Sequence, residues 1–210
     1  MNPIPSGRRR LPEVVPQVEV KALRFGPQYM ERKTLADGTR VTLRVVRPSD
    51  SALLAEGFER LSPESRYRRF LGAKKVLSPA EVRYFSDCDG VNHFAIGAVV
   101  ERADGSEEGA GVARFVRLPR NPLAAEAALT VVDARQHNGL GSLLARRLFS
   151  AAAERGIREL QFHVLSTNQP MLSLLRKLGR PAEHRANSEF DGDVLTIAVQ
   201  VRGVAPGTAA

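Results

Sequence analysis

The stretch Gln136–Ser142 combines glycine residues with the expected start of a helix, a pattern that suits the binding of an anion. It follows the apolar run 127–132 and precedes a strongly helical segment that begins near Leu140. The first amides of a helix have no carbonyl partner, and the helix dipole adds partial positive charge there. Gly139 and Gly141 remove Cβ atoms where a bulky anion would lie against the backbone. The pattern predicts an anion site, and a helix-entry loop without a ligand is the other interpretation of the same residues.

The carboxylate of Glu126 stands on the expected strand 125–132, ten residues before Gln136. An acid inside an otherwise apolar strand is costly unless it is exposed or used in chemistry. Glu126 is therefore either a functional carboxylate beside the anion loop or a solvated residue near the start of the strand.

The composition is that of one globular domain with an excess of positive charge. The chain has 210 residues, of which 43% are hydrophobic, enough for a single core. Half of the net charge of +8 lies in the first 33 residues, which hold seven Lys and Arg against three Asp and Glu. Such charge attracts polyanions in general. Nucleic-acid binding is unlikely on this sequence, because it has no Trp, few aromatic residues and no recognisable recognition helix.

Cysteine usage and apolar run lengths indicate a cytoplasmic protein without a membrane partner. Cys88 is the only cysteine, so an intrachain disulfide is impossible and a reducing compartment fits. The apolar runs are far shorter than the roughly 20 residues that a membrane helix needs. The first residues lack the apolar core of a secretory signal. The histidines and Cys88 show no metal-ligand spacing, so we expect no metal.

The distribution of proline and arginine predicts three regions. Residues 1–32 contain five prolines and the run Arg8–Arg10, which indicates a flexible N-terminal extension. Valines between Val14 and Val20 allow an edge strand within it. Residues 33–203 are expected to form the folded domain, and residues 204–210 a tail.

Hydrophobic periodicity and capping residues predict an α+β fold built on a mixed sheet. Ser62-Pro63 and Ser78-Pro79 are typical helix starts. A strand joined through a long helix to the next strand implies a parallel pair, whereas hairpins imply antiparallel pairs elsewhere. The predicted strands are 41–46, 93–101, 109–117, 125–132, 160–165, 182–185 and 194–201, and the predicted helices are 50–60, 62–70, 78–85, 139–155 and 168–178.

Six motifs occur in an order that resembles the GNAT superfamily of N-acetyltransferases. They are Arg44…Arg47-Pro48…Asp50, Leu61–Phe70, Gly111–Arg114, Ala125–Ala127, the Gln136 loop, and Asn168…Met171 with Lys177–Gly179. The resemblance covers roughly residues 40–201 and is greatest to the GNAT domain of bacterial protein-lysine acetyltransferases. It implies the GNAT fold, a mostly antiparallel mixed sheet flanked by helices with one parallel strand pair splayed at the cofactor site.

The resemblance also implies roles for individual residues. Acetyl-CoA is the expected acyl donor, and Glu126 stands where the similar enzymes have their general base. Asn168 stands where the family has an Asn that hydrogen-bonds the cofactor arm, and it can also cap a helix. The strand residues expected to pair with the pantetheine arm are Leu129, Thr130 and Val131, and those of the pyrophosphate loop are Gln136, His137, Asn138, Gly139, Leu140, Gly141 and Ser142.

Two departures from the family pattern leave a second function open. Many relatives have Gly-Arg or Gly-Lys where this chain has His137-Asn138, and many carry a Tyr acid within the segment that here spans 172–176. The favoured activity is acetyl transfer from acetyl-CoA to a primary amine, of a protein lysine or a small molecule, by direct attack in a ternary complex. The alternative is a coenzyme A-binding regulatory module with weak or no catalysis. The remaining candidates are interpreted as structural or solvated: His93 and His163, and a helix face of Arg66, Arg68 and Arg69.

Overall fold

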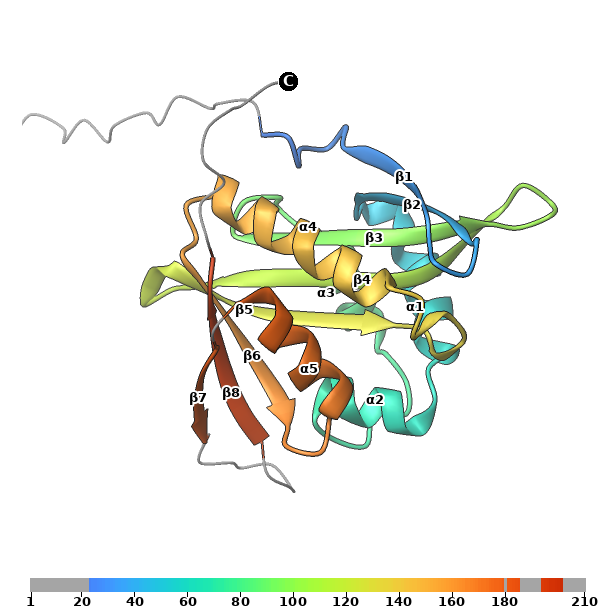
Figure 1. Cartoon of the computed structure of the whole chain (residues 1–210). Coiled ribbons are helices and arrows are strands. Elements are labelled where there is room, and N and C mark those ends of the chain that lie inside the picture. The colour runs from blue at the N-terminus through green and yellow to red at the C-terminus, as the bar shows by residue number, and fades with distance from the viewer. Residues whose placement is uncertain (1–22, 180, 186–193, 202–210) are drawn as a thin grey trace, which may run out of the picture.

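The computed structural model describes residues 23–179, 181–185 and 194–201, which form a sheet with helices on both faces (Figure 1). Each predicted strand and helix is present with somewhat shifted ends, and β1 is an addition. The strands are β1 (Met30–Thr34), β2 (Arg40–Val45), β3 (His93–Glu101), β4 (Glu107–Leu118), β5 (Asn121–Val131), β6 (Glu159–Leu165), β7 (Pro181–Arg185) and β8 (Val194–Gln200). The helices are α1 (Ser51–Glu59), α2 (Pro63–Phe70), α3 (Pro79–Ser86), α4 (Leu140–Glu154) and α5 (Gln169–Leu178), with 3₁₀ turns at Pro48–Asp50 and Asp133–Arg135.

The sheet has the order β1-β2-β3-β4-β5-β6-β8-β7. Among the described strands, β5 and β6 form the one parallel pair, and the other neighbours are antiparallel. Helix α4 connects β5 to β6, as a parallel connection requires. The mixed, mostly antiparallel sheet confirms the predicted α+β fold.

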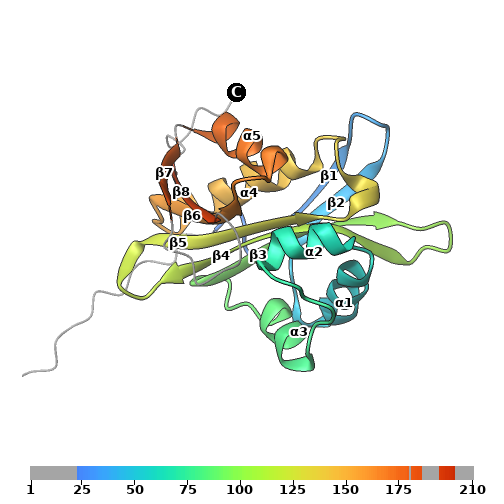
Figure 2. The ribbon, with the colours of Figure 1, turned by 90° about the horizontal axis from the view of Figure 1, so that it is seen from below.

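The helices lie in two layers, with α4 and α5 on one face and α1, α2 and α3 on the other (Figure 2). Helix α4 buries the apolar stripe that its periodicity predicted. Burial of each leucine on this stripe stabilises the folded state by about 1.5–3 kcal/mol. Below it, the rings of Phe94 and Phe115 stack with centroids 5.5 Å apart. The stripe consists of Leu140, Leu143, Leu144, Leu148, Ala151 and Ala152.

Two predicted helix starts are confirmed by their hydrogen bonds. The Ser62 hydroxyl accepts from the amide of Ser65 at 3.1 Å and caps α2. The Ser78 hydroxyl accepts from the amide of Glu81 at 3.3 Å, while the Glu81 carboxylate accepts from the amide of Ser78 at 2.8 Å. This reciprocal pair satisfies two amides at the start of α3 that the helix itself leaves without partners.

The fold begins before the predicted domain boundary between residues 32 and 33. Phe25 and Tyr29 lie in the main core with ring centroids 4.6 Å apart, and only 1% of Phe25 is exposed. The amide of Phe25 donates to the Glu154 carboxylate at 3.1 Å, and its carbonyl accepts from Arg155 at 2.8 Å. Residues 23–32 therefore belong to the fold and not to the predicted extension. Burial of two aromatic rings outweighs the proline-rich composition around them.

The remaining predictions about the chain ends fall outside the described residues. This applies to residues 1–22, which include the possible strand between Val14 and Val20, and to the predicted tail at 204–210.

Strand β1 is attached to α4 through Glu31. The Glu31 carboxylate accepts two hydrogen bonds from Arg147, at 2.6 and 2.7 Å, and a third from the Tyr29 hydroxyl. The Arg147 bonds are the main cause that lowers the pKa of Glu31 to about 2. Because this pKa lies below its ordinary value, the pair stabilises the fold fully above about pH 4.5 and loses its effect as the pH falls toward 2.

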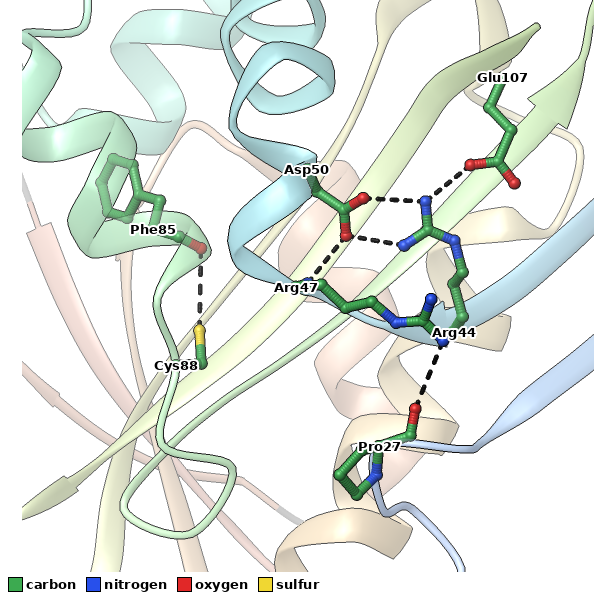
Figure 3. Close-up of polar contacts among 7 residues, drawn as sticks. All are labelled: Pro27, Arg44, Arg47, Asp50, Phe85, Cys88 and Glu107. Atoms are coloured by element: carbon green, nitrogen blue, oxygen red, sulfur yellow. Dashed lines mark hydrogen bonds and ion pairs between the residues drawn. The ribbon is translucent and has the colours of Figure 1, made fainter.

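A buried ion pair between Arg44 and Asp50 joins β2 to the start of α1 (Figure 3). Arg44 donates to both Asp50 oxygens, at 2.7 and 2.9 Å, and to Glu107 at 2.7 Å. Asp50 also accepts the amide of Arg47 at 2.8 Å. Removing one partner would leave a buried charge without compensation. The Arg44…Arg47-Pro48…Asp50 motif is therefore a structural one in this chain.

Gly111 allows β4, β5 and α4 to approach one another closely. A Cβ atom at this position would lie 2.9 Å from the carbonyl oxygen of Thr130 and 3.0 Å from Leu144 Cδ1. The first separation is shorter than real Cβ atoms show and involves backbone that cannot rotate away, whereas the second requires only a small shift of the Leu144 side chain. Glycine at this point of the Gly111–Arg114 motif therefore allows β4 and β5 to pair closely beneath Leu144 of α4.

The position of Phe25 gives a testable consequence for stability. We expect Phe25→Ala to lower the free energy of unfolding by about 3–5 kcal/mol, the usual cost of removing a buried aromatic ring. Chemical denaturation followed by circular dichroism measures this, with Leu123→Ala, which changes an exposed apolar residue, as the control. A chain that begins at residue 33 should be destabilised at least as much, and an unchanged cooperative melt would contradict the role of Phe25.

Candidate active site

A groove opens where β5 and β6 separate. The two strands pair only at Ala124–Glu126 against Glu159–Gln161, and beyond this contact β6 turns away (Figure 1). The groove has a volume of about 820 Å³ and is lined by residues of β5, β6, α2, α5 and the loop before α4. Backbone groups of residues 127–131 on the side of β6 have no strand partner there. Apart from the carbonyl of Val131, which accepts a hydrogen bond from Gln136, they are available to a ligand.

The loop before α4 presents free amides to this groove. Gly139 has φ of +94°, a left-handed conformation that glycine adopts without strain. Within the described residues, the amides of Gly139, Gly141 and Ser142 have no hydrogen-bond acceptor. A Cβ on Gly141 would make an ordinary van der Waals contact with Leu129, so no clash requires glycine at this position. The absence of a side chain instead leaves the groove open. These amides and the helix dipole give the loop the anion-binding character that the sequence predicted.

The side chain of Gln136 fastens the loop to the end of β5. Its Nε2 donates to the carbonyl of Val131 at 3.1 Å and lies 3.5 Å from the hydroxyl of Ser65 in α2. His137 follows with φ of +65°, a conformation that suits the glycine many family members carry there.

Asn138 and Leu140 are predicted cofactor contacts that do not line the groove. Asn138 is buried, its Oδ1 accepts the amide of Leu140 at 3.2 Å, and its Nδ2 donates to Asp37 at 3.0 Å. The side chain of Leu140 lies in the main core. Many relatives carry a cation at this position. In this chain Asn138 joins the loop to the β1–β2 turn, because its side-chain amide bonds to the backbone of Leu140 and to the carboxylate of Asp37 at the same time.

Glu126 lies on the groove wall, at the last residue of the β5–β6 contact. Its side chain is exposed, and within the described residues it forms no ion pair. Arg69 of α2 is a cation that interacts with it electrostatically. The other predicted contacts on the same groove are Leu129, Thr130, Val131, Gln136, His137, Gly139, Gly141, Ser142 and Asn168.

Asn168 both caps α5 and faces the groove. Its Oδ1 accepts the amide of Met171 at 3.3 Å, which confirms the predicted helix cap. Helix α5, where many family members carry a Tyr, presents Ser173 and Lys177 to the groove instead.

Sequence reasoning missed the contribution of α2 and β6. Arg69, interpreted as part of a solvated helix face, lines the groove together with Ser65 and Arg68. The hydroxyls of Ser62 and Ser65 both bond to Asp133, at 2.7 and 2.9 Å, and so hold α2 across the end of β5. That contact spans about 70 residues of chain, and no local pattern signals it. His163 also lines the groove, with Nδ1 3.1 Å from the hydroxyl of Thr196.

Comparison with known protein families agrees with this geometry. The family model described as "Acetyltransferase (GNAT) family" matches residues 59–179, more than half of the chain. An acetyltransferase of Pseudomonas aeruginosa is 32% identical over 154 residues, which are 73% of this chain and 81% of that protein. Acetyltransferase Pat of Mycolicibacterium smegmatis is 34% identical over 144 residues, 65% of this chain but 40% of that protein. The chain belongs to the GNAT family of acetyltransferases, as its motifs predicted.

Solved structures show the same architecture. The GNAT domain of S. lividans PAT superposes with a TM-score of 0.72 at 26% identity, covering 84% of this chain and 99% of that one. A cAMP-binding acyltransferase from Mycobacterium smegmatis gives a TM-score of 0.56 at 28% identity, with 82% of this chain and 47% of that one covered. YncA of Salmonella typhimurium, solved with its cofactor acetyl-CoA, shares the fold at a TM-score of 0.58 and 18% identity, over 81% of this chain and 99% of that one. The chain spans less than half the length of the two mycobacterial relatives.

No helix within residues 23–179, 181–185 and 194–201 combines the length and the apolar character that crossing a bilayer requires.

The link between Asn138 and the β1–β2 turn predicts a remote effect on ligand affinity. Asp37→Ala removes the acceptor of the Asn138 amide, so the loop loses one support and coenzyme A should bind about 2- to 10-fold more weakly. Isothermal titration calorimetry measures this. Asp104→Ala, which changes an aspartate in the turn before β4 that bonds to Ser106, is the matched control. Equal affinities in the two variants would show that the turn does not support the loop.

Proposed function

We propose that this chain is an acetyl-CoA-dependent N-acetyltransferase that transfers the acetyl group to a primary amine. The observation that carries the proposal is a single groove that joins free helix-start amides at one end to the carboxylate of Glu126 at the other. The first feature suits a diphosphate, and the second suits the removal of a proton from an amine.

The residues of the groove fit the parts of coenzyme A. The amides of Gly139, Gly141 and Ser142 would hold the pyrophosphate, and the unpaired edge of β5 at Leu129–Val131 would hydrogen-bond the amides of the pantetheine arm. Asn168 would contact the same arm. The presence of acetyl-CoA in YncA, which has this fold, supports this assignment. Bound acetyl-CoA supplies an acetyl group activated as a thioester.

Glu126 is proposed as the general base. An amine of the lysine type has a pKa of about 10.4 in water, so near pH 7 it must lose a proton before it can attack. Glu126 would accept that proton, directly or through a water, while backbone amides of β5 stabilise the charge that develops on the carbonyl oxygen. Attack within the complex of both substrates needs no covalent enzyme intermediate, and the leaving thiolate can take its proton from water.

The acceptor is proposed to be a protein lysine or a small-molecule amine. The resemblance to the GNAT domain of bacterial protein-lysine acetyltransferases favours the lysine. The same groove also accepts a small amine, because Glu126 is exposed at its wall.

A second candidate function is a coenzyme A-binding regulatory module without catalysis. Two observations favour it over an efficient enzyme. The side chain of Glu126 is exposed to solvent, and α5 presents no Tyr to the groove. Acetyl transfer detected by mass spectrometry on a panel of amines and lysine peptides decides between the two.

Ligand binding should stabilise the protein. Coenzyme A at 100 times its dissociation constant adds about 2.7 kcal/mol to the free energy of unfolding, so the melting temperature should rise by a few degrees. Gly139→Glu should abolish the shift, because the new carboxylate blocks and repels the pyrophosphate. Differential scanning fluorimetry measures it.

The matched control for this variant is Gly105→Glu. Gly105 has φ of +81° in the turn before β4, with open space around it, so it carries the same backbone penalty away from the groove. It should lower the melting temperature without removing the shift. No shift in the unmutated protein at millimolar coenzyme A would count against the proposed function.

Replacement of the base should lower turnover in a pH-dependent way. Glu126→Gln keeps the shape of the side chain but accepts no proton, so the rate near neutral pH should fall by about 10²- to 10⁴-fold. The deficit should shrink as the pH rises toward 10, because free amine then forms without a base. Steady-state kinetics between pH 6.5 and 10 test this.

Glu159→Gln serves as the control for Glu126→Gln. Glu159 lies on β6 beside the same strand contact but accepts hydrogen bonds from Gln161 and Gln200 instead of facing the groove. It should leave the rate within about 2-fold and the affinity for coenzyme A unchanged. A normal rate in Glu126→Gln would move the search to another base, and a joint loss of rate and cofactor affinity would make the role of Glu126 structural.

A further inference from the structure

The three arginines of α2 have different surroundings. Arg66 donates to the carbonyls of Lys75 and Glu59 at 2.9 and 2.8 Å, and Arg68 pairs with Glu64 at 2.5 Å. Within the described residues, Arg69 has no such hydrogen bond or ion pair. A guanidinium carries five N–H donors, so those of Arg69 remain available.

Arg69 is held in place by aromatic rings. Its guanidinium carbon lies 5.0 Å from the ring centroid of Phe70 and 6.0 Å from that of Phe85. Stacking of this kind stabilises a cation and restricts the plane of the guanidinium without using its N–H groups. The side chain is therefore positioned in advance for a planar, bidentate partner.

The surroundings of Arg69 have an excess of positive charge. Burial and then the charge of Arg114 lower the pKa of Arg69 to about 10, while Glu126 acts in the opposite direction, so the group stays charged near pH 7. Arg114 is itself satisfied, by the carbonyl of Phe85 and the ring of His93, both at 3.1 Å. A half-buried cation that has no anionic hydrogen-bond partner among the described residues is costly, and an incoming anion would relieve that cost.

Arg69 and Glu126 line the same groove, and the two opposite charges interact electrostatically across it. An amine that reaches Glu126 brings the neighbouring atoms of its own molecule within range of Arg69. We propose that Arg69 binds a carboxylate of the acceptor, so that the substrates of this enzyme are primary amines with a carboxylate close to the amine. This inference rests on the proposed N-acetyltransferase function and narrows its substrate class.

The surrounding charges favour a carboxylate over a phosphate. Glu126 would repel a dianionic phosphate more strongly than a carboxylate, whose single negative charge Arg69 alone can balance. The geometry of a carboxylate also matches the two parallel N–H bonds of a guanidinium. Such a group has two possible sources, an acidic side chain next to a lysine in a protein or the α-carboxylate of a free amino acid.

The test compares acceptors that differ only in this charge. One pair is a lysine peptide with Glu or Gln beside the lysine, and the other is L-lysine or L-lysinamide. In the unmutated enzyme, kcat/KM should be about 10- to 100-fold higher for the carboxylate member of at least one pair, mostly through KM. Preference within the peptide pair alone assigns a protein substrate, and preference within the amino-acid pair alone assigns a small molecule.

Arg69→Gln should reduce the ratio of kcat/KM between the two members of a pair to about 1. Arg69→Lys should keep part of the preference, because lysine retains the charge but not the planar arrangement of N–H donors. Arg83→Gln, which removes an exposed charge of α3 outside the groove, should leave it unchanged. An unmutated enzyme without preference in either pair would overturn the inference. A fall in kcat/KM in Arg69→Gln that is equal for both members of a pair would also overturn the inference, because Arg69 would then act on Glu126 or on folding.

A binding measurement separates this inference from the proposed function. The four acceptors are added to the protein saturated with coenzyme A, and the melting temperature is recorded. A larger rise with a carboxylate member, absent in Arg69→Gln, supports the carboxylate site even if no acetyl transfer is found. Equal shifts across both pairs, together with acetyl transfer to any amine, would overturn the inference and leave the N-acetyltransferase function standing.

Discussion

The functional geometry of this protein depends on how short the parallel contact between β5 and β6 is. Only three residues of each strand pair, and the contact ends at Glu126. A longer contact would close the groove and occupy the backbone groups of residues 127–131. A missing contact would separate β6, β8 and β7 from the rest of the sheet. The strand pair therefore keeps the sheet in one piece and leaves an edge free for a ligand at the same time.

The second requirement is a fixed position for α4, because the loop at its start carries the free amides. Several elements contribute to this. The apolar stripe packs the helix on the sheet, with Leu144 lying over Gly111. Arg147 joins the middle of the helix to Glu31 of β1. Asn138 and Gln136 connect the loop to the β1–β2 turn and to β5. Anion binding by a helix start is thus a property of the whole fold, although the amides themselves are local.

Much of the fold was predictable from sequence because the relevant interactions are local. The caps at Ser62 and Ser78 depend on residues three positions apart, and the stripe of α4 depends on helical periodicity. The parallel pair followed from the helix between two strands. Glu126 was identifiable because an acidic residue is unusual in an apolar strand, and the glycines of the loop because they stand at the expected start of a helix.

The remainder depends on contacts between distant parts of the chain. Glu154 and Arg155 at the end of α4 bond to the backbone of Phe25, whose ring lies in the core about 130 residues away in sequence. The partner of Asn138 is Asp37, about 100 residues away, so its role in joining two loops had no local signal. Arg69 lies in an arginine-rich helix that looks solvated in sequence. Only the placement of α2 across β5 brings it beside Glu126.

Gly111 shows how variation far from a ligand can affect ligand binding. Its missing Cβ lets Thr130 and Leu144 approach, yet it does not line the groove. A side chain there would force the backbone of β5 to move at Thr130, which itself lines the groove. In a deep mutational scan scored by acetyltransferase activity, position 111 would therefore cluster with the groove residues. Surveys that rank positions by distance from the bound molecule would misclassify it as a neutral strand residue.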